Sequence, residues 1–342
     1  MENTMMVSVG IKALNEQTHI AQCLESALAA VAPLGGEVIL ADSGSTDRTI
    51  EIARTFPVRI LQLANPAERS CGTGAQLAFQ QAQGEFFYML DGDMILHRSF
   101  LRKGIDYLRA HPDCAGVGGI VHECSIQAEE FQIRDAELRK QAAAAERMVN
   151  RLDCGGLYRM AALREVGYFA DRNLHAFEEF ELGVRLRARG WKLARIEESA
   201  VDHYGHAVGG YRLLTRRIRS GYSGAPGEVV RGAIGHPHWR LVLTDLRHVR
   251  HGLVVFAWWI TLLAAIISNR PALVLLLVLA PLIFLTIRRR SPRLGFYSLV
   301  AWNVSAASLL AGFFRKRRSP GEPVAAIDLT PAAQRNPANG VM

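Results

Sequence analysis

Two aspartates, Asp91 and Asp93, stand one residue apart directly after the apolar run Phe86–Leu90. Two carboxylates this close on one turn repel each other unless a cation lies between them. Mg²⁺ and Mn²⁺ prefer oxygen ligands, which they commonly share with the phosphates of a substrate. The Asp-Gly-Asp turn therefore predicts a divalent metal site that receives a substrate carrying a diphosphate.

Two more polar clusters follow apolar runs in the same way. Asn15 and Glu16 come after Met6–Lys12, and Asp42–Asp47 (DSGSTD) comes after Glu37–Ala41. Asp, Ser and Gly are common where strands meet helices, so each cluster alone is equally compatible with turn and capping chemistry. Three such junctions together favour a binding site over three ordinary turns.

The position of these clusters depends on an alternation of strands and helices. Strands alternating with helices at this spacing predict an α/β fold with a mostly parallel sheet covered on both faces. In such a sheet, ligands bind beyond the carboxyl ends of the strands. The predicted strands are Met6–Lys12, Glu37–Ala41, Arg59–Leu63 and Phe86–Leu90, and the predicted helices are about 20–31, 50–56, 71–83 and 128–149.

Charge is distributed unevenly along the 342 residues. Of the 40 Lys and Arg residues, eleven lie between Leu246 and Ser319, where there is no Asp or Glu; the rest has 29 basic and 32 acidic residues. That balance disfavours a nucleic-acid-binding face. The chain has no P-loop lysine motif and no GxGxxG after its first strand, which disfavours phosphoryl transfer and dinucleotide redox chemistry. Five cysteines without paired spacing predict reduced thiols, and Met1–Met6 has no apolar signal region.

Four segments in order resemble the family 2 glycosyltransferases, which have the Rossmann-like GT-A fold. They are Val7–Glu16 (VSVGIKALNE), Asp42–Asp47 (DSGSTD), Asp91–Asp93 (DGD) and Phe177–Leu193 (FEEFELGVRLRARGWKL), and the resemblance covers most of residues 6–225. It implies transfer of a sugar, with inversion, from a nucleotide-diphosphate sugar, by default a UDP-sugar, with Mn²⁺ or Mg²⁺ as cofactor. Members with C-terminal membrane segments typically build lipid-linked or exported polysaccharides, so a lipid-linked or saccharide acceptor is expected.

The resemblance assigns the nucleotide-sugar site residue by residue. Asp42 matches the acid that binds the nucleobase, and Glu16 matches the acid near the ribose. Asn15, Ser43 and Ser45 lie in the same motifs and are expected to bind the nucleotide sugar with them.

The resemblance also assigns the metal site and the base. Asp91 and Asp93 match the metal-binding pair, with Asp91 also near the nucleotide sugar. Glu179 falls where the family normally has the catalytic aspartate, and Glu178 is the alternative base. His203 is expected as a further metal ligand, with a hydrogen-bonded structural histidine as the alternative.

Several positions depart from the family pattern. Lys12 stands where many members have proline, and Gln76 stands where a small polar residue is common. Arg216–Ser220 replaces the QxxRW signature of processive synthases, which disfavours a long homopolymer as product. Arg219 remains a candidate for the diphosphate of the donor, although exposed helix arginines are the ordinary alternative. Glu178, Glu179 and Glu181 are also compatible with simple first-turn helix acids.

The C-terminal third is predicted to contain the membrane region. We expect a catalytic domain over residues 1–232, and Trp239, Val242, Leu246 and Leu253 predict an amphipathic helix over 233–252. The membrane region, residues 253–318, contains spans at about 253–268 and 271–287 and a third apolar run at 296–314. Residues 319–342 are expected to be a disordered tail.

Flanking arginines favour two spans with the third run at the membrane interface, and a catalytic domain that faces the cytosol from the plasma or inner membrane. Three spans are the alternative. Two other functions are alternatives for a chain with this layout. One is a sugar-nucleotide nucleotidyltransferase, which normally has a Gly-rich basic loop near its N-terminus, and the other is an inactive membrane scaffold. Asp42, Asp91, Asp93 and Glu179 speak against the scaffold.

Overall fold

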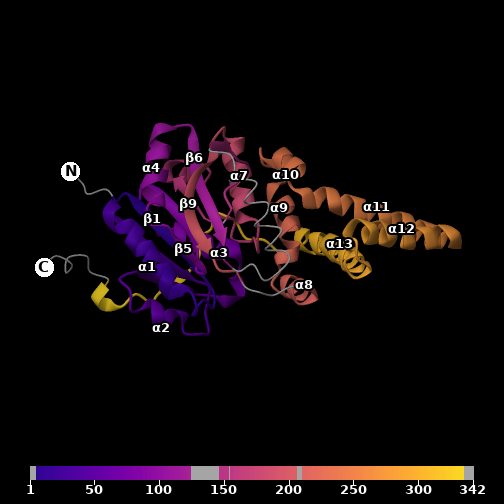
Figure 1. The fold of residues 1–342 in the computed structure, drawn as a ribbon, viewed down its shortest axis with the longest axis horizontal. Helices are drawn as coiled ribbons and strands as arrows, with labels where there is room; N and C mark the ends of the chain where they lie inside the picture. Colours follow the sequence, from indigo (N-terminus) through magenta and orange to yellow (C-terminus); the bar gives the residue numbers. More distant parts are fainter. Residues whose placement is uncertain (1–4, 125–145, 154, 206–209, 335–342) are drawn as a thin grey trace. The chain divides into compact units, whose positions relative to one another are not determined.

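The computed structural model describes residues 5–124, 146–153, 155–205 and 210–334. They fall into two compact units (Figure 1). The first unit comprises residues 1–174, 178–207 and 317–342, and the second comprises residues 175–177 and 208–316. The first unit thus ends before the predicted boundary at residue 232 and includes the C-terminal residues.

One twisted sheet forms the frame of the first unit. Its strands have the order β10-β3-β2-β1-β4-β8-β6-β9-β5, with β7 paired to β9. β1, β2, β3 and β4 are mutually parallel, as are β6 and β9, whereas β5, β7, β8 and β10 pair antiparallel. The strand bounds are β1 Val7–Ala13, β2 Gly36–Asp42, β3 Arg59–Leu63, β4 Phe86–Asp91, β5 Met94–Leu96, β6 Cys114–Glu123, β7 Glu146–Met148, β8 Gly156–Arg159, β9 Lys192–His203 and β10 Ala326–Asp328.

Apolar side chains are buried on both faces of this sheet. Val9, Ile11 and Tyr88 pack in one cluster, whereas Ile39 and Phe87 pack in another. Because successive strand residues point to opposite faces, near-continuous apolar strands fill both layers. This confirms the predicted α/β fold with a mostly parallel sheet. The helices of the unit are α1 Ile20–Val31, α2 Thr49–Ala53, α3 Cys71–Phe79, α4 Phe100–Ala110, α6 Met160–Glu165 and α7 Glu178–Ala188, with short 3₁₀ turns at 32–34, 66–68 and 332–334.

The strand register aligns the predicted site residues. Ala13 on β1 is opposite Asp42 on β2, and Lys12 on β1 is opposite Asp91 on β4. The polar clusters after these strands therefore lie at one edge of the sheet.

One predicted helix lies in the middle of the chain. The helix predicted over about 128–149 falls mostly outside the described residues, and its last part is wrong, because Glu146–Met148 is strand β7, paired with β9. A helical pattern cannot reveal a partner strand that lies about 50 residues later.

The prediction of a disordered tail from residue 319 is wrong for the described part. β10 pairs antiparallel with β3, and Val324 is buried among the apolar residues of the sheet. The side chain of Gln80 holds Val324 by two hydrogen bonds, donating to its carbonyl oxygen at 2.6 Å and accepting its amide at 3.0 Å. The polar composition of this segment predicts disorder. The segment is nevertheless ordered, because it pairs with an open edge of the sheet and buries a few side chains.

The second unit is helical. Its elements are α8 Gly210–Arg219, the 3₁₀ turn η3 Tyr222–Gly224, α9 Ala225–Ala233, α10 Trp239–Asp245, α11 Arg247–Ile267, α12 Pro271–Arg289 and α13 Pro292–Phe313. α11 and α12 pair antiparallel, with the Trp258 indole donating to the carbonyl of Leu277 at 2.9 Å. The continuous amphipathic helix expected over 233–252 is wrong, because the extended backbone of Leu246 separates α10 from α11.

The burial of Val324 yields a test of the tail's role. Val324→Asp places an unpaired charge in an apolar cluster, so we expect the full chain in detergent to lose at least about 3 kcal/mol of unfolding free energy. Thermal unfolding followed by circular dichroism measures this loss. Ile327→Asp is the matched control, because that side chain is 50% exposed, and its effect should stay within about 0.5 kcal/mol. Equal effects would contradict a packed tail.

Candidate active site

Asp42 ends β2 and is completely buried. Its Oδ2 accepts hydrogen bonds from the amides of Gly44 and Ser45 at 2.8 and 2.9 Å and from Nε2 of Gln62 at 2.9 Å. Its Oδ1 is also buried but has no partner among the described residues. A buried acceptor without a donor is costly, so Asp42 is suited to receive an N–H from a ligand.

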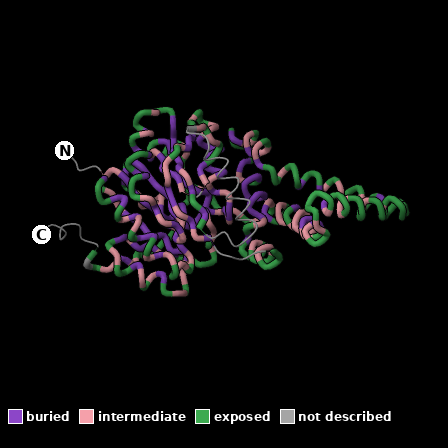
Figure 2. Tube along the Cα trace, in the orientation of Figure 1, coloured by how far each residue is buried: buried purple, intermediate pink, exposed green. Residues whose placement is uncertain are grey.

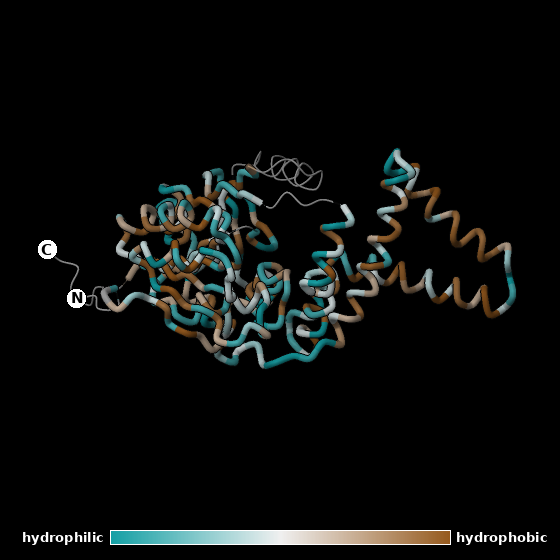
Figure 3. The backbone as a smooth tube through the Cα atoms, turned by 90° about the horizontal axis from the view of Figure 1, so that it is seen from below, coloured by the Kyte–Doolittle hydropathy of each residue, from teal (hydrophilic) through white to brown (hydrophobic). Residues whose placement is uncertain are grey.

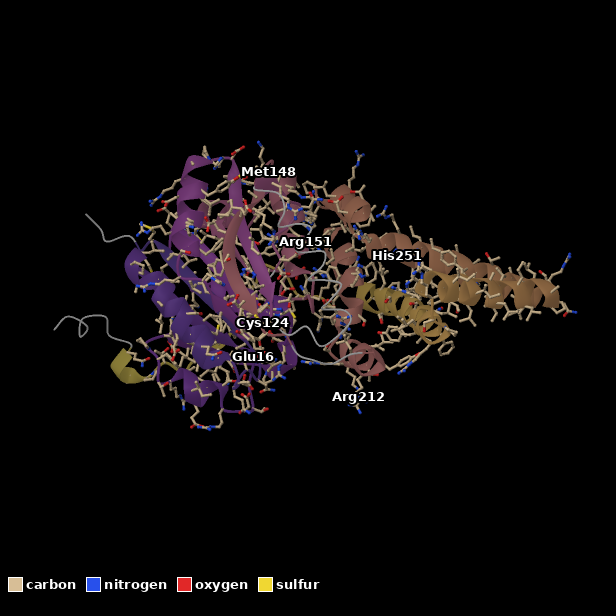
Figure 4. The ribbon with its side chains drawn as sticks, viewed as in Figure 1. Glu16, Cys124, Met148, Arg151, Arg212 and His251 are labelled. Carbon is tan, nitrogen blue, oxygen red and sulfur yellow. The ribbon has the colours of Figure 1, made fainter. Side chains whose placement is uncertain are left out.

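The two loops beside Asp42 are locked together by Asn15 and Ser45. The amide of Asn15 donates to the Ser45 hydroxyl at 2.8 Å, and the Asn15 side chain accepts the amide of Thr46 at 2.8 Å. Asn15 has a positive φ of 60°, which this residue type tolerates well. The same loop carries Glu16, whose amide donates to Thr49 at 2.8 Å (Figure 4). Asn15 and Ser45 thus shape the loop pair, and their contact with a nucleotide sugar stays a prediction.

Ser43 follows Asp42 and donates its amide to the carbonyl of Ala13 at 2.9 Å. Its own carbonyl accepts a hydrogen bond from Nε of Arg69 at 2.7 Å, and Nη2 of Arg69 donates to Gly44 at 3.0 Å. Arg69 therefore fixes the turn that contains Asp42.

Lys12 supplies a positive charge between two carboxylates. Its Nζ lies 2.5 Å from Oε1 of Glu178 and 3.2 Å from Oδ1 of Asp91. Burial alone would lower the pKa of Lys12, but the carboxylates of Asp91, Glu178 and Glu179 outweigh it and raise that pKa well above its ordinary value. Burial raises the pKa of Asp91, and the Lys12 ammonium opposes this shift. Glu178 is thus occupied in an ion pair.

Glu179 occupies the same first turn of α7 but is half-buried and makes no hydrogen bond or ion pair within the described residues. Burial, followed by the neighbouring charge of Glu178, raises its pKa to about 8. A carboxylate with a pKa near neutrality and no bound partner can accept a proton. This contrast favours Glu179 over Glu178 as a base.

His203 ends β9 between two acids. Its Nδ1 lies 2.7 Å from Oε2 of Glu123, and its Nε2 lies 3.5 Å from Oδ2 of Asp93. Burial lowers the pKa of His203, but the bonds to Asp93 and Glu123 outweigh it and raise the pKa to about 9. Glu123 orients the ring, so that Nε2 faces Asp93. Two carboxylates and one oriented imidazole are a donor set that suits Mn²⁺ or Mg²⁺, with imidazole favouring Mn²⁺.

Glu181, the third acid of α7, has a structural role. It forms a two-bond ion pair with Arg185 at 2.7 and 2.8 Å, and Arg185 also donates to the carbonyls of Tyr168 and Phe169. Gln76 accepts the amides of Phe169 and Ala170 from the other side. Glu181 therefore matches the alternative of a structural acid.

Arg219 lies on α8 in the second unit and is exposed. It lines an open hollow of about 630 Å³ together with Tyr211, Arg212, Thr215, Arg216 and Ser220. Its assignment to the donor diphosphate stays a prediction.

A second group of metal-ligand types includes one residue of β6 and one of β9. Ligand atoms of His97, His122 and Asp202 lie within 4.8 Å of one another, with His97 and Asp202 in contact at 3.0 Å. Asp202 and His122 immediately precede His203 and Glu123, so they point to the opposite face of their strands. This group is separate from Asp91, Asp93 and His203.

Some residues of the site escaped the sequence analysis. In the sequence, Lys12 stands out only as a departure from the family pattern. No motif marks Glu123, Gln62 or Arg69 as residues of the site. The signal for Glu123 was its place at the end of a long apolar strand, but the parallel register that puts it opposite His203 is a property of the fold.

Comparison with known proteins agrees with this arrangement. Residues 8–167 match the family model described as glycosyl transferase family 2. The succinoglycan biosynthesis protein ExoA of Rhizobium meliloti is 25% identical over 219 residues, 58% of this chain and 62% of that protein. The low-salt glycan biosynthesis hexosyltransferase Agl6 of Haloferax volcanii is 35% identical over 106 residues, 30% of this chain and 25% of that protein. The chain thus spans less than two thirds of either relative.

Among solved structures, the chain is similar to a mannosyltransferase from Pyrobaculum calidifontis in complex with GDP-mannose and Mn²⁺. The TM-score is 0.58 at 19% identity, with 88% of this chain and 86% of that chain covered. This likeness confirms the predicted GT-A fold.

A double-mutant cycle measures the coupling energy between Lys12 and Glu178. Removing either partner leaves a buried charge, whereas Lys12→Met with Glu178→Gln removes both, so we expect a coupling of about 1–3 kcal/mol in unfolding free energy. The control is the Lys103–Glu198 pair, with an N···O distance of 2.6 Å and side chains 50% and 34% exposed. Solvent screening should hold its coupling below about 1 kcal/mol. A Lys12–Glu178 coupling no larger than the control would contradict the role of Lys12.

Proposed function

We propose that this chain, whose residues 8–167 match the family model of glycosyl transferase family 2, transfers a sugar from a nucleotide-diphosphate sugar to an acceptor hydroxyl with inversion at the anomeric carbon. The observation that carries the proposal is the arrangement at one sheet edge. Asp42 at the end of β2 offers a buried oxygen without a partner among the described residues, and Asp91 ends β4, on the other side of β1. Asp93 lies two residues beyond Asp91, and Glu179 has no hydrogen-bond or ion-pair partner among the described residues.

The nucleobase is assigned to Asp42. Uracil and guanine both present an N–H that the unused Oδ1 can accept, and Gln62, Gly44 and Ser45 fix the other carboxylate oxygen. The solved relative is a complex with GDP-mannose. A UDP-sugar remains the default donor for this chain, and Glu16 is the candidate for the ribose.

Asp91, Asp93 and His203 are the residues that would hold Mn²⁺ or Mg²⁺. Their oxygen and nitrogen donors fit such an ion, and Glu123 fixes the orientation of His203. When bound, the ion stabilises negative charge on the departing diphosphate. The mannosyltransferase of similar fold contains Mn²⁺, which supports this assignment.

Glu179 is assigned as the base. Glycosyl transfer develops positive charge on the sugar ring, and the acceptor hydroxyl must lose its proton as it attacks. Attack from the face opposite the departing diphosphate inverts the anomeric carbon. Lys12 keeps Glu178 in an ion pair. Glu179, which has no such partner among the described residues, is therefore the carboxylate of the α7 turn that takes the proton.

The acceptor is proposed to be a lipid-linked or membrane-delivered saccharide. The chain contains helices that are long and apolar enough to cross a membrane, and one relative is a succinoglycan biosynthesis protein. Nucleotide sugars are made in the cytosol, so the active site is assigned to that side.

The proposal is tested by incubating the purified full chain with a panel of UDP- and GDP-sugars and membrane lipid extract, with and without Mn²⁺. Release of nucleotide diphosphate that requires both a donor and Mn²⁺ supports it. Release of inorganic diphosphate from a nucleoside triphosphate and a sugar phosphate would instead identify a nucleotidyltransferase. No release with any donor would favour the scaffold.

Asp93→Ala should abolish metal-dependent turnover in a folded protein, because it removes a proposed ligand. We expect at least a hundredfold loss of diphosphate release, with an unchanged thermal unfolding midpoint. Asp202→Ala is the matched control, since Asp202 lies on the opposite face, and it should retain turnover within a few-fold. Wild-type turnover of Asp93→Ala at limiting Mn²⁺ would exclude Asp93 as a ligand.

Glu179→Gln should retain donor binding but lose about 10²- to 10⁴-fold in turnover, since a general base typically contributes that much. A base must be ionised, so kcat/KM of the wild type should rise with pH and level off above about 8, the raised pKa of Glu179. Glu178→Gln removes the neighbouring negative charge, which lowers the pKa of Glu179, so the midpoint of its profile should move to lower pH. Turnover of Glu179→Gln within a few-fold of wild type would move the base elsewhere, Glu178 first.

A further inference from the structure

Three helices of the second unit, α11, α12 and α13, are long and apolar enough to cross a membrane, among the residues that the structure describes. Their lengths are 21, 19 and 22 residues. Figure 2 shows α11 and α12 exposed along most of their length, and Figure 3 shows that most of their residues are hydrophobic and that a polar turn joins them. Length and composition alone do not decide which of the three cross.

The path of the chain limits the number of crossings. The chain leaves the first unit at residue 207 and returns to it at residue 317, only four residues after α13 ends. β10 then pairs with β3, and Thr330 accepts a hydrogen bond from the buried amide of Ile60 at 2.9 Å. A segment that starts and ends in one folded unit starts and ends on one side of a membrane. The number of crossings is therefore even, and three is excluded.

The C-terminal end of α13 packs against polar elements. A Cβ on Gly312 would lie 1.9 Å from the carbonyl oxygen of Gly224 in η3, so the two backbones are in direct contact. Gly227 of α9 meets the carbonyl of Leu309 equally closely. α9 also contains Arg231, whose guanidinium lies 5.7 Å from the ring of Phe313.

Charge fixes this end of α13 further. Glu228 of α9 is almost fully buried and forms an ion pair with Arg315, two residues beyond α13. The imidazole of His175 completes the cluster, 2.8 Å from Glu228. Such a group of charges is costly in hydrocarbon, so this end of α13 lies at or outside the membrane surface.

The N-terminal end of α13 contacts the same polar segment. The ring of Tyr297 lies 5.1 Å from that of Tyr211, edge to face, and its hydroxyl donates to the carbonyl of Gly210 at 3.5 Å. A helix of 22 residues is about 33 Å long, enough to reach from one membrane surface to the other. Both ends of α13 nevertheless meet residues 210–233, which contain five arginines and one glutamate. α13 therefore lies along this polar segment and does not lead away from it.

α8 presents arginines on one face. Arg212, Arg216 and Arg219 are spaced four and three residues apart and are exposed, and Figure 4 shows Arg212 extending outward from the helix. Tyr211 and Ile218 are 48% and 47% exposed. Exposed arginines beside exposed apolar side chains suit the phosphate layer of a membrane, where each basic residue contributes roughly 1 kcal/mol near anionic lipids.

The connecting turns decide which pair of helices crosses. The turn between α11 and α12 contains one arginine, Arg270, whereas the turn between α12 and α13 is flanked by Arg288, Arg289, Arg290 and Arg293. Short loops rich in arginine stay on the cytosolic side. If α11 and α12 cross the membrane, all four of these arginines stay on the side of the first unit. If α12 and α13 crossed it, the four arginines would lie on the side opposite the first unit.

We infer that the chain crosses the membrane twice, through α11 and α12, and that α13 and α8 form an interfacial surface in contact with the phosphate layer of anionic lipids on the side of the first unit. The C-terminus lies on that same side. This topology does not depend on the proposed sugar transfer, and its test requires no catalytic activity.

Three matched Ser→Cys variants of the full chain test the topology in sealed vesicles of both orientations. A membrane-impermeant maleimide is applied, and labelled peptides are identified by mass spectrometry. The exposed native Cys124 marks the side of the first unit. We expect Ser291→Cys and Ser319→Cys to label from the side of Cys124, and Ser268→Cys from the opposite side.

Each other pattern overturns the inference. Labelling of Ser319→Cys opposite Cys124 would mean three crossings, since the end of α13 would then lie across the membrane. Labelling of Ser291→Cys alone from the opposite side would mean that α12 and α13 cross. Labelling of all three from the side of Cys124 would mean that no helix crosses.

Spin labels measure the depth of α13 directly. Val278→Cys near the centre of α12 and Ser305→Cys near the centre of α13 are both exposed positions. In vesicles containing anionic lipid, a water-soluble relaxant should reach the label at 305 several-fold more readily than the label at 278. Equal protection of the two labels would place α13 across the bilayer and refute its interfacial position.

Discussion

Repulsion among carboxylates is the constraint on which the rest of this site depends. Parallel register brings Asp42 and Asp91 to one edge of a sheet that is apolar on both faces, where charges interact strongly. Lys12 on β1 also contacts Glu178 of α7, so the α7 acids lie beside Asp91. The folded protein accommodates this repulsion because the carboxylates have different sets of partners. Asp42 accepts backbone and amide donors, Glu178 and Asp91 share Lys12, and His203 joins Glu123 to Asp93. Among these acids Glu179 lacks such a partner within the described residues, and burial, followed by the charge of Glu178, raises its pKa to about 8.

The rigid support of these acids comes from contacts between loops. Asn15 and Ser45 join the loops after β1 and β2, and Arg69 holds the turn after Asp42 from a distant segment. Arg185 and Gln76 clamp the loop before α7 from two sides. Polar residues that contact no ligand can therefore matter as much as those that do, because catalytic geometry tolerates little displacement.

Much of the fold could be predicted because its signals are local. The strands β1 to β4 appear as short apolar runs, and the acids that follow them must meet at one edge once the strands are parallel. The contacts of Lys12, Glu123 and Gln62 could not be predicted, because each depends on a partner far along the chain whose register only the folded sheet fixes. The strands β7 and β10 could not be predicted for the same reason. Their strand character comes from pairing with β9 and β3, and their own sequences show little of it.

The C-terminal residues return to the sheet after the three apolar helices. Most of the second unit is an insertion between β9 and β10 of one sheet, so the apolar helices lie in the chain between two segments of that sheet. Arg317 and Arg318 illustrate the consequence. Their place after an apolar run suggests a membrane flank, yet they pair with Asp171 and Glu68 of the first unit. These basic residues beside an apolar helix thus form ion pairs within the first unit and help to hold the C-terminal segment in place. The tertiary contacts of such residues must be known before their charge is used to orient a membrane protein.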